Sequence, residues 1–133
     1  MTSPLPFQRR GFRARHDGSA IAKAPVKRRA DGFRSGTEAR YAVELERRKQ
    51  TGEVVWWKYE AVKLRLADNT FYSPDFAVQL HSGELEMHEV KGFWQDTARV
   101  KIKVAAELFP FLFVVVTAKA KKDGGGFQLQ EVE

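Results

Sequence analysis

Two short stretches of this sequence, Ser73-Pro74-Asp75-Phe76-Ala77-Val78 and His88-Glu89-Val90-Lys91-Gly92, decide the fold that we predict. Each stretch is the charged end of an apolar, strand-like run. Asp75 lies at the start of one run, and Glu89 and Lys91 lie near the end of the next. Side chains alternate between the two faces of a strand, so Glu89 and Lys91 are expected to point the same way. Two carboxylates and one ammonium group are therefore predicted to meet at one edge of a sheet.

The residues around these stretches predict an α/β fold. Residues 54–66, 71–80 and 85–91 are rich in β-branched and aromatic side chains, which favours three antiparallel strands, with a bend or bulge of the first near residue 60. Pro74 cannot donate a hydrogen bond to a ladder, so we expect an edge or a bulge there, with the Asp75 carboxylate open to solvent.

Helices are predicted on either side of these strands. One helix begins near Ser35 and ends near Gln50, and a second spans residues 96–108, with Val100, Val104, Ala105 and Leu108 as its apolar stripe. An apolar strand follows at residues 111–117, and residues 127–132 favour a last one. A helix between two strands lets the second run parallel to an earlier one. The prediction is a central mixed sheet flanked by helices, in the order helix, three antiparallel strands, helix, strand.

The first predicted helix carries an acid on the side that should face the sheet. Ser35-Gly36-Thr37-Glu38 has the capping-box pattern, which gives Glu38 a local role. Glu38 also lies three, four and seven residues before Tyr41, Ala42 and Leu45, on the same apolar stripe. We interpret Glu38 as a third carboxylate of the site in addition to any capping role. His88 alternates to the face opposite Glu89, so we expect it to be packed or exposed rather than catalytic.

The composition restricts the kind of metal site that can form. The chain has no cysteine and three scattered histidines, which excludes thiolate-held zinc and a histidine cage. Oxygen ligands favour magnesium, manganese or calcium. In such a site Asp75 and Glu89 would bind Mg²⁺, with the Val90 carbonyl as a further ligand, and Lys91 would act on the attacking water or on the developing phosphate charge. The structural alternative is an ion pair between Glu89 and Lys91 with no metal.

The positive charge is concentrated at the N-terminal end. Residues 1–34 hold nine basic and two acidic side chains, whereas the remaining residues hold 14 basic and 15 acidic ones. This segment lacks apolar periodicity, so we predict a poorly ordered basic arm over residues 1–34 and a folded domain over residues 35–133. Cations on such an arm favour nucleic acid as the partner, and the alternatives are a solubilising tail or an acidic protein partner. The candidate DNA contacts are Arg9, Arg10, Arg13, Arg15, Lys27, Arg28 and Arg29 in the arm, with Lys101 and Lys103 on the second helix.

Taken together, Glu38 on a first helix, Pro74-Asp75 and Glu89-Val90-Lys91 resemble the PD-(D/E)xK nuclease superfamily. More narrowly, the runs at residues 35–41, 72–76 and 88–92 resemble small phage-encoded endonucleases related in fold to Holliday-junction resolvases. The resemblance implies a restriction-endonuclease-like core in which Asp75, Glu89 and Glu38 are the metal carboxylates and Lys91 is the catalytic lysine. It also implies a magnesium cofactor, which Mn²⁺ can replace, 5′-phosphate products and a homodimer.

We therefore expect a magnesium-dependent DNA endonuclease that selects branched, nicked or junction DNA, since no helix suited to reading bases is evident. The alternatives are a non-catalytic DNA-binding or packaging accessory protein that keeps the same fold, and a nuclease directed at RNA. No apolar run approaches the length of a membrane span, and the first residues lack a secretory signal. The expected location is the cytoplasm of a bacterial host.

Overall fold

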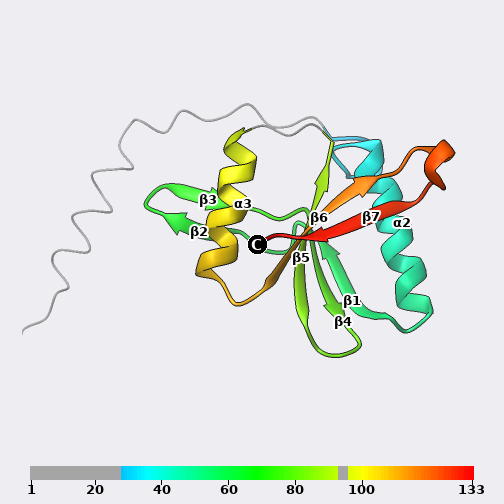
Figure 1. The fold of residues 1–133 in the computed structure, drawn as a ribbon, viewed down its shortest axis with the longest axis horizontal. Helices are drawn as coiled ribbons and strands as arrows, with labels where there is room; N and C mark the ends of the chain where they lie inside the picture. The colour runs from blue at the N-terminus through cyan, green and yellow to red at the C-terminus, as the bar shows by residue number, and fades with distance from the viewer. Residues whose placement is uncertain (1–27, 93–95) are drawn as a thin grey trace, which may run out of the picture.

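A computed structural model describes residues 28–92 and 96–133, and these residues form two helices around a five-stranded sheet with a separate hairpin (Figure 1). None of the helices in these two ranges is long and apolar enough to cross a membrane. The elements are α2 (Gly36–Gln50), β1 (Val54–Tyr59), β2 (Leu64–Ala67), β3 (Thr70–Tyr72), β4 (Phe76–Leu80), β5 (Leu85–Lys91), α3 (Asp96–Leu108), β6 (Leu112–Ala118), a short 3₁₀ turn (Lys121–Asp123) and β7 (Phe127–Glu131).

The sheet has the strand order β1-β4-β5-β6-β7 and is mixed. Strands β1, β4 and β5 are antiparallel neighbours, β6 runs parallel to β5, and β7 is antiparallel to β6. Helix α3 is the connection that turns the chain so that β6 can run parallel to β5. The predicted α/β class and the mixed sheet flanked by helices are confirmed.

Each of the predicted strands at residues 54–66 and 71–80 is divided into two, so the prediction of one strand over each range is wrong, although the bend expected near residue 60 is confirmed. Glu60 has φ of 50°, in the left-handed region, which ends β1 and sends the chain into the β2–β3 hairpin. Pro74 has no N–H for a ladder and lies between β3 and β4. It is fully buried in the break ahead of a central strand, so of the edge or bulge that we expected the edge is wrong.

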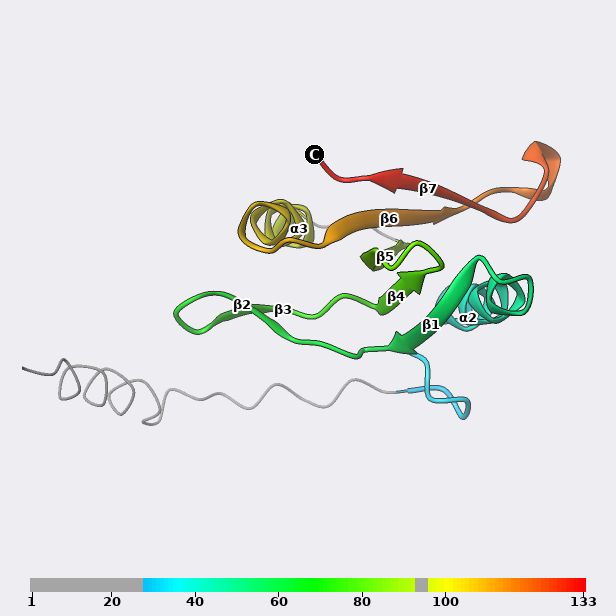
Figure 2. The ribbon, with the colours of Figure 1, turned by 90° about the horizontal axis from the view of Figure 1, so that it is seen from below.

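The helices cover opposite faces of the sheet, as the view in Figure 2 shows. Helix α2 buries Tyr41, Ala42 and Leu45 against the residues of one face, and Glu38 is buried on the same stripe, as predicted. The β2–β3 hairpin and α3 pack on the other face, whose core includes Met87 and Phe113.

The apolar stripe predicted for α3 is confirmed at Ala105 and wrong at Val100 and Leu108. Val100 and Leu108 are 60% and 54% exposed, whereas Ile102 and Ala105 are buried and Phe109 packs beside them. Residues at 102, 105 and 109 have helical spacing as well, so the sequence contains two candidate stripes. The two stripes share Ala105, and the side that carries Ile102 with it faces the strands, where the small Ala105 side chain lets the helix approach the hairpin and the sheet closely.

Candidate active site

Segments that are distant in the sequence meet at one end of the sheet, the upper end in Figure 1. The end of β1, the start of β4 and the end of β5 come together because β4 is antiparallel to both neighbours, with Phe76 opposite Tyr59 and His88. The first turn of α2 lies at the same end. Asp75 therefore lies between the other segments, and its carbonyl accepts a hydrogen bond of 2.8 Å from the Glu60 N–H.

Asp75 is buried, with 7% of its surface exposed, so the expectation of a solvent-open carboxylate is wrong. Its neighbours Pro74 and Phe76 are fully buried, so the backbone at Asp75 lies in the interior as well. The Val90 N–H donates a hydrogen bond of 2.8 Å to Asp75 Oδ2, which replaces water at one carboxylate oxygen. This bond links the start of β4 to the end of β5.

Glu89 and Glu38 reach the same end of the sheet, each held by a tyrosine. The Tyr72 hydroxyl donates to Glu89 Oε1 at 2.7 Å, and the Tyr59 hydroxyl donates to Glu38 Oε1 at 2.8 Å. The sequence did not indicate a role in the site for these two tyrosines. Their contacts depend on where the end of β1 and the β2–β3 hairpin lie in the folded protein.

The capping box at the start of α2 is half formed. Ser35 Oγ accepts from the Glu38 N–H at 3.2 Å, as expected of the N-cap. The reciprocal bond goes instead from the Arg34 N–H to Glu38 Oε1, at 3.1 Å. Glu38 thus fixes the chain just before the helix while its carboxylate remains in the group of acids.

The three carboxylates repel one another electrostatically. Burial, then the charges of Glu89 and Glu38, and a hydrogen bond shared with Glu38 raise the pKa of Asp75 to about 8. Burial and the charge of Glu38 raise the pKa of Glu89 to about 6, against the opposing effects of the Tyr72 hydrogen bond and the Arg34 charge. Clustered acids with raised pKa values are typical of a site that binds a cation or transfers protons.

The chemistry of this donor set fits a hard divalent cation, since it consists of carboxylate oxygens in a partly dry setting. Within residues 28–92 and 96–133, no group of three His, Cys, Asp or Glu side chains is already arranged to hold a metal ion. Glu38 is turned toward Tyr59 and Arg34, and one Asp75 oxygen faces Val90. Metal binding here would therefore require the side chains of these acids to rotate.

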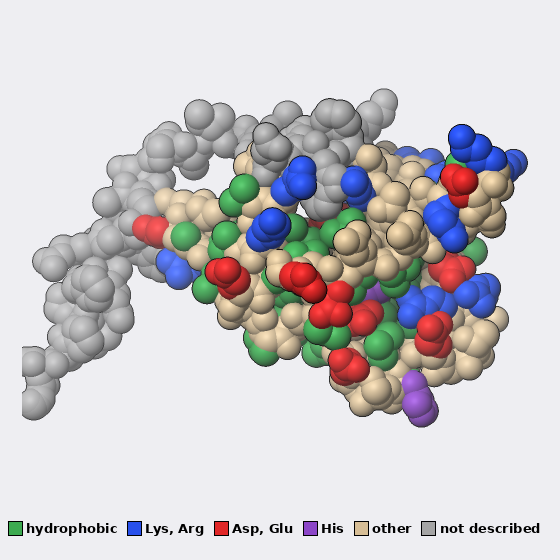
Figure 3. All heavy atoms as spheres, viewed as in Figure 1, with side chains coloured by type: hydrophobic (Ala, Val, Ile, Leu, Met, Phe, Trp, Pro, Cys, Tyr) green, Lys and Arg blue, Asp and Glu red, His purple; other side chains and the backbone are tan. Residues whose placement is uncertain are grey.

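Lys91 lies on the same sheet face as Glu89 and lines a cleft of about 670 Å³ beside α3. The cleft contains three cationic side chains, from Lys91, Arg99 and Lys103, together with polar groups from Thr117, Gln130 and the acids of residues 131 and 133. Figure 3 shows Lys and Arg side chains gathered near the upper end of α3, with acidic side chains below them. Of the two lysines predicted on this helix, Lys103 lines the cleft, and Lys101 is half-buried outside it.

The predicted arm is only partly within the described residues. Arg9, Arg10, Arg13, Arg15 and Lys27 lie outside them. Arg28 forms an ion pair with Glu60, and Arg29 pairs with Asp31. Phe33 packs on the core beside Tyr59. The last residues before α2 therefore lie against the domain, next to the acids.

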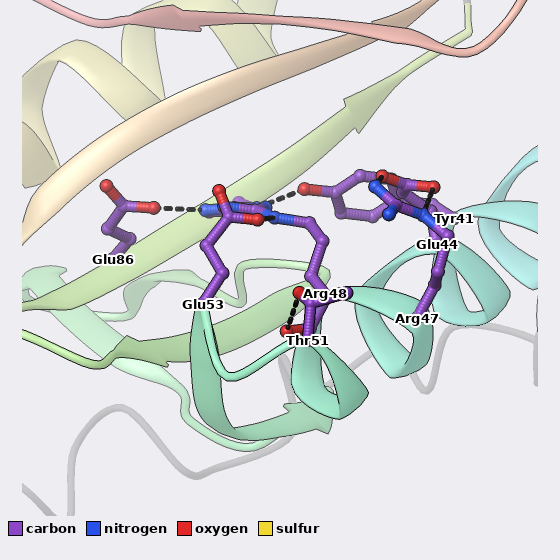
Figure 4. Close-up of polar contacts among 8 residues, drawn as sticks. Tyr41, Glu44, Arg47, Arg48, Thr51, Glu53 and Glu86 are labelled. Carbon is purple, nitrogen blue, oxygen red and sulfur yellow. Dashed lines mark hydrogen bonds and ion pairs between the residues drawn. The ribbon is translucent and has the colours of Figure 1, made fainter.

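A second polar cluster lies under α2, on the opposite face from Glu89. His88 is completely buried, as the packed alternative predicted; its Nδ1 is 2.7 Å from the Tyr41 hydroxyl, and its Nε2 is 2.8 Å from Glu86 Oε1. Figure 4 shows these bonds running from Glu86 across the ring to Tyr41, with the Arg48–Glu53 pair beside them. Burial lowers the pKa of His88, so the ring is neutral at pH 7. The cluster fixes α2 on the sheet and thereby positions Glu38.

Replacing Tyr41 by Phe should lower the free energy of unfolding by about 1–2 kcal/mol, because it leaves a ring nitrogen of His88 buried without its partner. The ring contacts of Tyr41 with Phe76 and Phe127 would remain. Urea denaturation measures the change. Glu86→Gln keeps an acceptor for His88 and should cost less; an equal or larger loss in that variant would contradict the role given to the Tyr41 hydroxyl.

Comparisons with protein-family models, with curated proteins and with solved structures found no match to this chain.

Proposed function

We propose that this chain is a metal-dependent DNA endonuclease with a restriction-endonuclease-like core of the PD-(D/E)xK type. The observation that carries the proposal is the arrangement of Asp75 and Glu89. They lie at the adjoining ends of two neighbouring strands, joined through the Val90 N–H, and Glu38 from α2 acts on both. Burying mutually repelling acids is costly for the fold, and a cation is the partner that would offset this cost.

In this proposal, Asp75, Glu89, Glu38 and the Val90 carbonyl would hold Mg²⁺ or Mn²⁺. The bound metal would lower the pKa of a coordinated water and neutralise charge on the phosphodiester. Lys91, at the end of β5, would orient or deprotonate the water, or stabilise the charge that develops on the phosphate. The water oxygen would lose a proton and form a bond to phosphorus as the bond from phosphorus to the 3′ oxygen breaks, and the leaving 3′ oxygen would take up a proton. The products would be a 3′-hydroxyl end and a 5′-phosphate end.

The cleft beside α3 supports a polynucleotide substrate. Its cations extend from Lys91 along the helix, where they could contact phosphates on the strand that enters the site. Contacts of this kind depend on the backbone and shape of DNA rather than its sequence. We therefore infer that the protein is phage-encoded and that it cuts branched, nicked or junction DNA, as a single protomer or as a homodimer.

The test is a cleavage assay on supercoiled, linear and four-way-junction DNA, with a parallel RNA substrate, in Mg²⁺ or Mn²⁺ and in chelator. Metal-dependent cleavage of the junction in preference to the linear duplex is expected. If only the RNA substrate is cleaved, the protein is a ribonuclease and the DNA substrate that we propose is wrong. Absence of cleavage of every substrate, with tight DNA binding retained, would favour the non-catalytic accessory protein.

The arm is tested in the full chain by a variant in which Gln replaces Arg9, Arg10, Arg13 and Arg15 together. This variant should bind DNA more weakly, and its plot of log Kd against log salt concentration should be shallower by up to about 3 to 4. Each lost phosphate contact removes about 0.9 from this slope. Fluorescence anisotropy at several salt concentrations, in chelator, measures the slope. An unchanged slope would refute the DNA-binding role of the arm.

A further inference from the structure

Two arginines next to the carboxylate site share one glutamate. Arg28 Nη2 lies 2.8 Å from Glu60 Oε1, and Arg34 Nε lies 3.0 Å from Glu60 Oε2. Each cation thus takes a separate oxygen of the same carboxylate. We name this group, Arg28, Glu60 and Arg34, the arginine fork. Two guanidinium groups around two oxygens of one anion is also the arrangement that binds a phosphate.

The backbone of Glu60 is in a conformation that its residue type disfavours. Its φ of 50° is left-handed, which is unfavourable for a residue with a Cβ atom. Partly exposed ion pairs contribute little to stability, so the pairs themselves do not account for this conformation. The same residue donates its N–H to the Asp75 carbonyl at 2.8 Å. The position is therefore tied to the site, and its carboxylate is directed toward the two arginines.

The fork is accessible and lies beside the acids. The side chains of Arg28, Arg34 and Glu60 are 39%, 44% and 24% exposed, so an external anion can reach both cations. The Arg34 N–H is bonded to Glu38, and the Arg34 charge acts on Glu89. Arg28 also lies over the Tyr59 ring, 6.0 Å from its centroid, and Tyr59 bonds Glu38. A phosphate held here would lie at the edge of the carboxylate site.

We propose that the arginine fork is a binding site for a phosphodiester of the DNA backbone, and that Glu60 occupies it in the free protein as a substitute for that phosphate. When DNA binds, a backbone phosphate replaces the Glu60 carboxylate between Arg28 and Arg34. This positions the strand next to Asp75 and Glu89. The inference rests on the proposed DNA substrate, although it concerns binding rather than cleavage.

The test compares DNA affinities of the full chain in chelator, where no cleavage occurs, by anisotropy of a labelled four-way junction. Glu60→Gln should tighten binding by at least about 5-fold and steepen the salt slope by about one to two, because it frees cations for phosphate. The gain should disappear in the double variant Arg34→Ala/Glu60→Gln. Glu44→Gln is the matched control, because it removes the same charge and frees Arg47 on an exposed part of α2.

An equal gain in Glu60→Gln and Glu44→Gln would overturn the proposal, since only net charge would then matter. A gain that persists without Arg34 would overturn it as well. If Glu60→Gln does not fold, as judged by circular dichroism, Arg34→Ala and Arg34→Lys in otherwise unchanged protein decide the question. Arg34→Ala should weaken binding more than Arg47→Ala does, and Arg34→Lys should restore part of the loss. Equal losses in the two alanine variants would refute the fork.

The two proposals fail separately. If the protein cuts DNA with magnesium but Glu60→Gln does not bind DNA more tightly, the nuclease proposal stands and the phosphate site at the arginine fork is refuted. If Glu60→Gln binds DNA more tightly in an Arg34-dependent way but the protein cuts no substrate, the phosphate site is supported and the nuclease proposal is refuted.

Discussion

Asp75→Asn and Glu89→Gln should each reduce magnesium-dependent cleavage by about 100- to 1,000-fold or more, the loss found when one charge-stabilising group is removed from an active site. Both changes conserve shape. The Asn oxygen can still accept from the Val90 N–H, and the Gln oxygen can still accept from the Tyr72 hydroxyl. The loss would therefore come from the missing charge rather than from misfolding. Single-turnover cleavage of the junction measures the rate.

The control for both changes is Glu84→Gln. Glu84 is an exposed acid in the turn between β4 and β5, so its cleavage rate should stay within about 2-fold of the unsubstituted protein. Lys91→Ala should reduce the cleavage rate as much as Asp75→Asn and Glu89→Gln do, while DNA binding in chelator stays nearly intact. Full activity in Asp75→Asn would exclude the carboxylate site as the catalytic centre.

The strongest sequence signals gave the correct parts of the fold. The residues of β5 and α3 were predicted with their observed bounds, because each is a periodic run between clear breakers. Residue alternation in β5 also put Glu89 and Lys91 on one face and His88 on the other, as observed. Helical spacing placed Glu38 on the buried stripe of α2.

The sequence could not indicate features that depend on tertiary pairing. The sequence indicates a bend near residue 60 but not that residues 60–63 leave the sheet, because Glu60 and its neighbours are ordinary strand or loop residues by type. The burial of Asp75 follows from the packing of Pro74 and Phe76, not from its own polarity. The arginine fork joins residues 28, 34 and 60, whose proximity results from the turn before α2 packing on β1. Such contacts have no fixed sequence spacing.

Without metal, Asp75→Asn should also make the protein more stable at pH 8, by at least about 2 kcal/mol, because the raised pKa of Asp75 is a cost to folding. An acid whose pKa is higher in the folded state binds more protons there than in the unfolded chain. Stability attributable to this group therefore falls as pH rises from about 4, the ordinary range of a carboxyl, to about 8. The Asn variant lacks this decline, and its amide can donate to the neighbouring carboxylates.

Urea denaturation in chelator at pH 5 and pH 8 measures the stability cost of the Asp75 carboxylate, because this cost is present at pH 8 and small at pH 5. Glu89→Gln should give a smaller gain, which develops between about pH 4.5 and pH 6 and persists at pH 8, in keeping with its smaller shift. His88 acts in the opposite sense: its lowered pKa makes stability fall as pH drops below its ordinary value of 6.5. Adding Mg²⁺ should stabilise the unsubstituted protein through binding to the folded state, and this increment should vanish in Asp75→Asn. If Asp75→Asn is instead less stable at pH 8 in chelator, the buried carboxylate supports the fold and there is no cost for a cation to offset.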